Sequence, residues 1–137
     1  MSNIHAQLIL QSLAYVEENL QDRRQIEAWY DELIPKDWRM PPRDVVWVYD
    51  VRIPGMTLKQ QDLIVKTLNE KGIAARHGFK PMSSQLEYNM CKSDKRPEAT
   101  RASREIIYLP VHPHLSSDDV RSICNSLIDT REWSLIR

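Results

Sequence analysis

Hydrophobic positions near the start of the chain recur at spacings of three and four residues, which is typical of a helix. The first members of this pattern are Ile9, Leu13, Val16 and Leu20. The pattern predicts either one long helix over residues 3–34 or two helices joined near Asp22, with Pro35 ending the segment. A helix this long in a chain of 137 residues is expected to brace against another structure.

The rest of the chain alternates between two kinds of pattern. A run rich in β-branched and aromatic residues predicts a strand over residues 44–53. Two further strands are predicted over residues 73–77 and 106–111. Apolar stripes at helical spacing predict helices over residues 57–72 and 116–130. A short helix with Pro97 in its first turn is predicted over residues 96–105, and residues 78–96 are predicted to form a loop. Capping signals support two of these helices, Thr57 with Gln60 and Ser116 with Asp118 and Asp119. Gly72 suits the left-handed position that ends a helix.

This order of elements predicts an α/β (α+β) fold. We expect a small three-stranded, mainly antiparallel sheet in which the third strand lies between the first two, with helices covering one face. The length fits a single domain over residues 1–137, made of a long helical segment (1–34) and a small α/β part (35–137).

Composition argues against several classes of protein. Nineteen basic residues balance nineteen acidic ones, which argues against a nucleic-acid-binding protein. The sequence contains neither an apolar run long enough to span a bilayer nor the layout of a signal peptide. Cys91 and Cys124 are far apart and are interpreted as two reduced thiols. We therefore expect a cytoplasmic protein without a membrane partner.

Candidate catalytic chemistry is sparse. The four histidines lack the spacing of a metal site, and neither a nucleophile elbow nor a glycine-rich phosphate loop is present. Of the seven lysines, none lies in an apolar setting that would lower its pKa for Schiff-base chemistry, and Lys66, Lys71 and Lys80 are interpreted as surface residues. No catalytic, cofactor-binding or metal-binding residue is therefore assigned.

One segment, GIAARHGFKPMSSQLEY over residues 72–88, brings together residues suited to binding. Arg76 suits a phosphate or carboxylate, while Phe79 or Tyr88 could pack on a sugar or base ring. His77 is grouped with them, so that Arg76, His77, Phe79 and Tyr88 form one candidate constellation. The alternative is a structural loop in which Phe79 and Met82 fill the core, and residue type alone favours that alternative.

Three segments together resemble a known family. Residues 1–33, the segment 72–88, and ASREIIYLPVHPHLSSDDVRSICNSLI over residues 102–128 are similar to the C-terminal part of DegT–StrS-type sugar aminotransferases. The resemblance includes Arg23 and Arg24 followed by Tyr30 in the first segment. It extends from Met1 to about Asp129.

The resemblance implies the C-terminal small domain of an aspartate-aminotransferase-like fold. Complete members are dimeric pyridoxal-phosphate enzymes that transfer an amino group to a nucleotide-linked keto-sugar, as in polysaccharide biosynthesis. The Schiff-base lysine and the cofactor-binding residues of the family lie in a large domain that would precede Met1. The resemblance therefore implies a chain without bound cofactor that is inactive alone, whether an excised domain, a split gene or a truncated reading frame.

Within the resemblance, Arg76, Phe79 and Tyr88 match the family pattern and are expected to be substrate-side residues. Two departures are Ser83, where many members have His, and Leu86, where Pro is usual. The expected partners are a separate large domain or further copies of the chain, since the first helix would expose its apolar side chains. The alternative function is a non-catalytic binding or assembly module that retains the small-domain fold.

Overall fold

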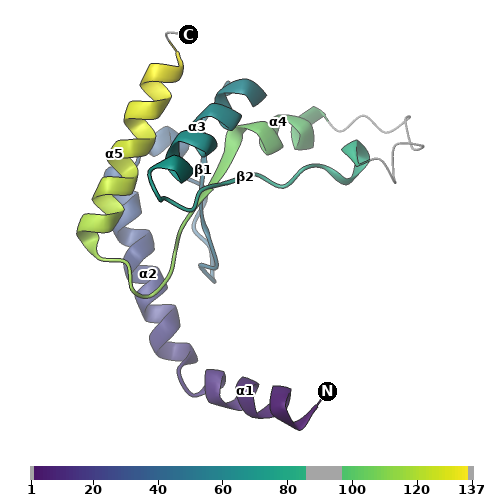
Figure 1. The fold of residues 1–137 in the computed structure, drawn as a ribbon, viewed down its shortest axis with the longest axis vertical. Helices are drawn as coiled ribbons and strands as arrows, with labels where there is room; N and C mark the ends of the chain where they lie inside the picture. The colour runs from purple at the N-terminus through teal and green to yellow at the C-terminus, as the bar shows by residue number, and fades with distance from the viewer. Residues whose placement is uncertain (1, 86–96, 136–137) are drawn as a thin grey trace.

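The computed structural model describes residues 2–85 and 97–135. The helices are α1 (Asn3–Leu13), α2 (Val16–Leu33), α3 (Leu58–Glu70), α4 (Pro97–Glu105) and α5 (Ser117–Ser134). The strands are β1 (Tyr49–Arg52), β2 (Arg76–His77) and β3 (Ile106–Leu109), and two 3-10 turns lie at Lys36–Trp38 and Met82–Ser84. Helix α1 projects away from the body formed by the other elements (Figure 1).

The predicted sheet topology is confirmed. β3 lies between β1 and β2 and pairs antiparallel with both, giving the order β1-β3-β2. Buried and half-buried residues alternate along β1 and β3, so Tyr49, Val51, Ile107 and Leu109 point toward the helices. The opposite face, which we call the open face, carries Asp50 and Tyr108.

All three strands are shorter than predicted, and side-chain hydrogen bonds explain most of the difference. The carbonyls of Val46 and Trp47 accept hydrogen bonds from Arg23 Nη1 at 3.4 and 3.0 Å, and the Val48 carbonyl accepts one from Arg43 at 3.1 Å. These carbonyls are therefore occupied by side chains instead of a neighbouring strand. The Ala75 carbonyl likewise accepts a bond from Asn69 Nδ2 at 2.9 Å, and β2 begins only at Arg76.

The N-terminal helical segment consists of two helices, and the predicted junction near Asp22 is wrong. The break lies at Ala14–Tyr15, whereas Asp22 lies inside α2. Ser12 Oγ donates to the Leu8 carbonyl at 2.9 Å, and such back-bonding bends helices. The Tyr15 amide then bonds Ser12, three residues back, instead of continuing the regular pattern.

The predicted helix ends are confirmed where a specific side chain sets them. Thr57 and Gln60 form a reciprocal capping box at the start of α3, and Ser116 does the same with Asp119 at the start of α5. Gly72 follows α3 with a φ of 80°, which a residue with a side chain rarely adopts.

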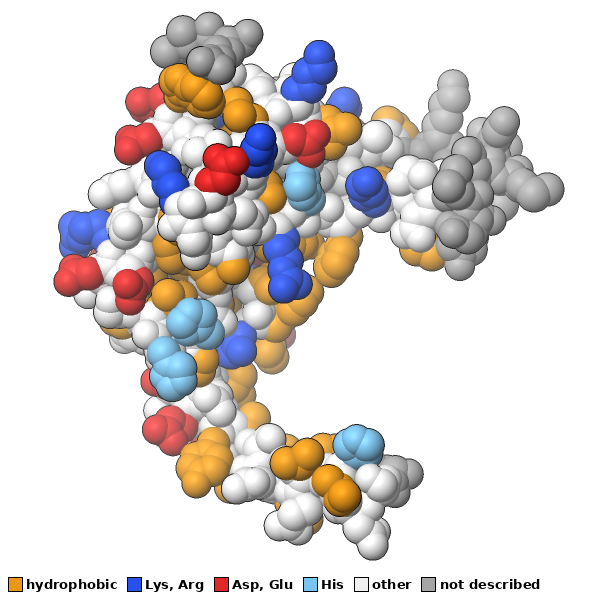
Figure 2. Space-filling view, viewed as in Figure 1, with side chains coloured by type: hydrophobic (Ala, Val, Ile, Leu, Met, Phe, Trp, Pro, Cys, Tyr) orange, Lys and Arg blue, Asp and Glu red, His pale blue; other side chains and the backbone are white. Residues whose placement is uncertain are grey.

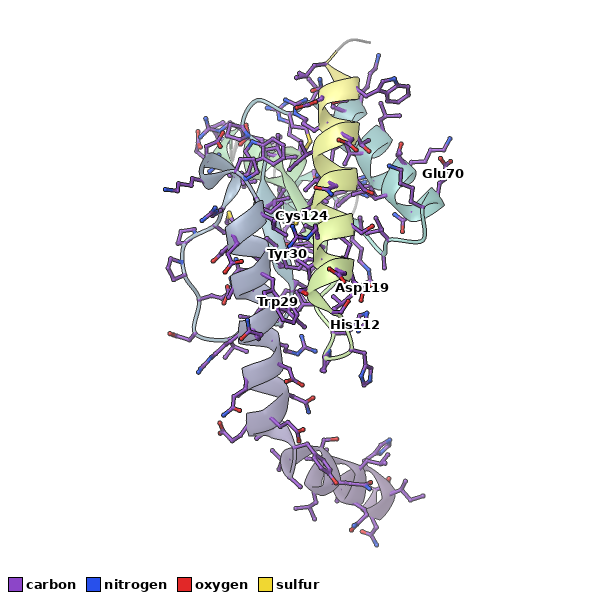
Figure 3. The ribbon with its side chains drawn as sticks, turned by 90° about the vertical axis from the view of Figure 1, so that its left-hand side faces the viewer. Trp29, Tyr30, Glu70, His112, Asp119 and Cys124 are labelled. Atoms are coloured by element: carbon purple, nitrogen blue, oxygen red, sulfur yellow. The ribbon has the colours of Figure 1, made fainter. Side chains whose placement is uncertain are left out.

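The core lies between the sheet and helices α2, α3 and α5. Tyr30 of α2 stacks on Tyr49 of β1 with ring centroids 4.4 Å apart, and each hydroxyl donates a hydrogen bond. Tyr30 donates to the Pro110 carbonyl at 2.9 Å, and Tyr49 donates to Asp31 at 2.7 Å. Figure 3 shows Tyr30 and Cys124 where α2 meets α5. Burial raises the pKa of the Cys124 thiol to about 12.

Candidate functional site

Antiparallel register places three polar side chains in one row across the open face. Tyr108 of β3 is paired with Asp50 of β1 on one side and with Arg76 of β2 on the other. Directly paired residues of antiparallel strands point to the same face, so Arg76 lies beside the Tyr108 ring. Arg76 is exposed and makes no ion pair with any other residue that the structure describes.

Three aromatic rings cluster on this face. The Phe79 ring centroid lies 5.4 Å from that of Tyr108 and 6.3 Å from that of Trp47, and the Trp47 and Tyr108 centroids are 6.2 Å apart. Trp47 and Phe79 are nearly parallel, at 10°, yet they remain 60% and 70% exposed. Large aromatic groups that are this exposed make the cluster a candidate contact surface.

The alternative in which Phe79 and Met82 fill the core is wrong. Both side chains are more than half exposed, and neither belongs to the buried cluster. Gly78 brings the chain close to the end of α4 and the start of β3: a Cβ there would lie 2.9 Å from the Ser103 carbonyl oxygen. The segment after β2 therefore passes close to the junction of α4 and β3, and Phe79 lies on the surface.

Two arginines hold the segment that presents Trp47. Arg23 of α2 binds the Trp47 carbonyl, and Arg43 binds the Val48 carbonyl. Arg43 also pairs with Asp50 and, at 3.2 Å, with Glu27, and its guanidinium lies 5.7 Å from the Tyr49 ring centroid. Burial raises the pKa of Glu27 above its ordinary value, although the Arg43 charge opposes this shift.

A shallow hollow adjoins the aromatic cluster, with a volume of about 230 Å³. Its wall is formed by Met40, Pro41, Arg43, Trp47, Val48, Asp50 and Tyr108. Burial raises the pKa of the Tyr108 phenol, partly offset by a hydrogen bond from the Phe79 backbone. Tyr108 therefore remains a neutral hydroxyl near neutral pH, so the face offers flat rings, one neutral phenol and the Arg76 cation.

The structure separates the residues that the sequence grouped. Arg76 lies on the open face, but His77 lies on the helix-covered face, where its Nε2 is 2.8 Å from Asp62 Oδ1 of α3. His77 therefore cannot act together with Arg76. Tyr88 lies outside the described residues.

Trp47 is the member of this face that the sequence pattern missed. It lies inside a segment that reads as a continuous strand, and residues 30 or more positions later complete its cluster. No signal in the sequence identifies Trp47. Its exposure follows from the binding of the Val46 and Trp47 carbonyls by Arg23, which only the folded structure shows.

The described residues do not fit pyridoxal phosphate. All five described lysines, Lys36, Lys59, Lys66, Lys71 and Lys80, are exposed, and Lys66 pairs with Glu70 at 3.8 Å on the surface. A lysine that carries this cofactor must be held in a desolvated site, and none of these five is. Within residues 2–85 and 97–135, no cluster of three or more His, Cys, Asp or Glu side chains could hold a metal ion. None of the described helices has the length and apolar character needed to cross a membrane.

Comparison with known proteins defines the class. The model of the DegT/DnrJ/EryC1/StrS aminotransferase family matches residues 1–128, and the chain belongs to this family.

Two relatives make the comparison specific. GDP-perosamine synthase from Caulobacter vibrioides is 27% identical over 135 residues, which cover 93% of this chain and 36% of that protein. A protein from Streptococcus pneumoniae described as a sugar aminotransferase superposes with a TM-score of 0.87 at 27% identity, over 99% of this chain and 37% of its own. It has also been solved in a PLP form.

A more distant structure supports the fold alone. PseC from Helicobacter pylori, an aminotransferase involved in the biosynthesis of pseudoaminic acid, superposes with a TM-score of 0.76 at 20% identity. The chain spans little more than a third of the length of each of these relatives. The resemblance that the sequence suggested is thus confirmed at the level of the family and of the fold.

Proposed function

We propose that this chain is the small C-terminal domain of a pyridoxal-phosphate-dependent sugar aminotransferase acting on a nucleotide-linked keto-sugar, and that it is inactive alone. The observation that carries the proposal is the family match over residues 1–128 in a chain that spans about 36% of its curated relative. The exposed lysines support the second half of the proposal, because they offer no desolvated amine for the cofactor.

The test of inactivity uses the purified 137-residue chain. It is mixed with pyridoxal phosphate, glutamate and a GDP-linked keto-sugar, and the products are separated by chromatography. We expect no saturable absorbance band of bound cofactor and no amino-sugar. Turnover by the chain alone would contradict the proposal. Recovery of turnover when a separately produced large domain of the family is added would support it.

Within this proposal, the open face supplies substrate-side contacts. Phe79 and Trp47 would stack on the base or sugar ring, and Arg76 would bind a phosphate. Stacking of a base on an aromatic ring contributes about 1–3 kcal/mol, and an arginine adds a salt-sensitive attraction. Tyr88 stays a predicted member of this set.

This assignment can be tested on the same chain by NMR. GDP is titrated into the isotope-labelled chain up to roughly 10 mM, a range that detects a binding free energy of only about 3 kcal/mol. We expect shifts of the Trp47 indole and of the Phe79 amide, and weaker binding by at least about fivefold in Phe79→Ala. Arg76→Ala should weaken binding mainly at low salt, whereas Arg121→Ala, an exposed arginine on α5, should not. Unchanged spectra would show that the open face does not bind nucleotide in this chain.

A second candidate is a non-catalytic assembly module that retains the small-domain fold. The observation that favours it is the exposure of α1, none of whose residues is buried. The two candidates differ in one readout, because only the first predicts that a large domain restores turnover.

A further inference from the structure

Two adjacent arginines on α2 have different surroundings. Arg23 is half-buried, and its Nη1 donates to the carbonyls of Val46 and Trp47 at 3.4 and 3.0 Å. Arg24 is exposed and donates to neither of these carbonyls. Successive positions of a helix are about 100° apart, so the two side chains leave α2 in different directions. Arg23 therefore reaches the segment that carries Trp47, and Arg24 does not.

The guanidinium of Arg23 is committed to backbone carbonyls. Arg23 makes no ion pair with any other residue in the described part of the chain. Its two partners are consecutive carbonyls that lie outside the sheet, because β1 begins only at Tyr49. Carbonyls without a strand partner need another donor, and one guanidinium nitrogen carries two hydrogens. Arg23 thus fixes the backbone at Trp47 from 24 positions earlier in the chain.

The three rings of the open face are placed in three different ways. Tyr108 lies in β3, where pairing with both neighbouring strands fixes it. Phe79 follows Gly78, whose amide donates to a carbonyl of β3 at 2.9 Å. Trp47 lies outside the strands, and its side chain is 60% exposed, so burial in the core does not hold it. The bond to its own carbonyl is therefore the described contact that sets where the indole lies.

The position of this indole matters because the rings are arranged for a shared contact. The planes of Trp47 and Phe79 differ by only 10°, and their centroids lie 6.3 Å apart. Figure 2 shows hydrophobic side chains on the side of the body below the segment that follows β2. A planar ligand ring can contact both rings only while the indole keeps this orientation.

We infer that Arg23 is a positioning residue that acts through Trp47: it holds the indole nearly parallel to Phe79, so that the open face can take up a planar ring. The inference rests on the proposed function in one respect, namely that this ring belongs to a nucleotide. In this role Arg23 itself contacts no ligand, in contrast to Arg76.

NMR of the purified, ligand-free chain tests the placement. The rings of Trp47 and Phe79 should give a nuclear Overhauser effect that is lost in Arg23→Gln and kept in Arg24→Gln. The control removes the same charge from the neighbouring position, and glutamine is a good helix former, so the far-UV circular dichroism of both variants should match the parent. A ring contact that survives Arg23→Gln, or that is lost equally in Arg24→Gln, would overturn the inference.

A double-mutant cycle with GDP tests the route by which Arg23 acts. Arg23→Gln should weaken GDP binding by at least about fivefold, as Trp47→Ala should, because stacking on the indole is lost in both. Arg24→Gln should leave binding nearly unchanged. In the Trp47→Ala background, Arg23→Gln should cause no further loss. A further loss in that background would mean that Arg23 acts directly or through general stability, and it would overturn the inference.

The two readouts separate this inference from the proposed function. If GDP binds no variant while the ring contact is lost only in Arg23→Gln, the nucleotide assignment fails and the positioning role of Arg23 is supported. Arg23→Lys is the second variant in case Arg23→Gln does not fold. It keeps the charge without the fork of the guanidinium, so the ring contact should weaken there too, and an unchanged contact would overturn the inference.

Discussion

Glu105 gives a sharp test of the packing between α4 and β1, because it is a carboxylate only 4% exposed. Its Oε2 accepts from Arg52 Nε at 2.8 Å, and its Oε1 accepts from the Gly55 amide at 3.0 Å. Burial would raise the pKa of Glu105, but the hydrogen bonds from Gly55 and Arg52 hold it below the ordinary value. These bonds fix the tight turn at Gly55, whose φ is 72°.

The magnitude follows from these two bonds. Each hydrogen bond to a charged group contributes about 1.5–3 kcal/mol to stability. Arg52 is partly exposed, so water competes for its guanidinium and its bond to Glu105 contributes less than a fully buried one would. We expect Glu105→Ala to lower the free energy of unfolding by about 3 kcal/mol and Glu105→Gln by about half as much. The control is Glu98→Ala on the same helix, where an exposed pair with Arg101 should contribute less than about 0.5 kcal/mol.

Urea denaturation followed by tryptophan fluorescence at several pH values measures both effects. Because the folded pKa is lower than the unfolded value of about 4.3, the stabilisation by Glu105 is present above that value and is lost as the pH falls through the folded pKa. The gap between wild type and Glu105→Gln should therefore be constant from neutral pH to about pH 5 and shrink below about 4.3. A gap that is the same at acid and neutral pH, or a cost for Glu105→Ala no larger than that for Glu98→Ala, would refute this account.

Three further predictions follow from the structure. Thr57→Ala should lower stability by about 1 kcal/mol in urea denaturation by removing the cap of α3, whereas Thr67→Ala within the helix should cost little. Leu127→Ala should cost about 2–5 kcal/mol because Leu127 is fully buried, whereas Leu58→Ala should cost less than about 0.5. The Cys124 thiol should resist alkylation at pH 8 until urea unfolds the chain, as measured by peptide mapping, because burial keeps its pKa near 12.

Local signals in the sequence predicted the features that local contacts create. The caps at Thr57 and Ser116 and the left-handed Gly72 each depend on residues within a few positions, and all three were predicted correctly. The strand order was also predictable, because short connections and a helix between the first two strands leave few arrangements of three strands.

The errors arose where distant residues decide the local structure. Residues 44–48 have the composition of a strand, but Arg23, more than 20 positions earlier, binds two of their carbonyls. The same contact fixes Trp47 beside Phe79, so the exposed aromatic cluster depends on pairings that no local pattern contains. His77 was misgrouped with Arg76 for a simpler reason: successive residues of a strand point to opposite faces, and the grouping ignored that alternation.

The buried core and the exposed apolar groups lie in different parts of this chain. Every buried hydrophobic residue among the described ones lies between Ile26 and Leu127, whereas the exposed apolar side chains concentrate on α1 and around Trp47 and Phe79. Since neither exposed group supports the core, the body can fold without whatever covers them, and changes at either surface should alter contacts more than folding. Among the described residues, the buried hydrophobic side chains form one cluster that includes no residue of either surface, so we expect the body to fold as a unit.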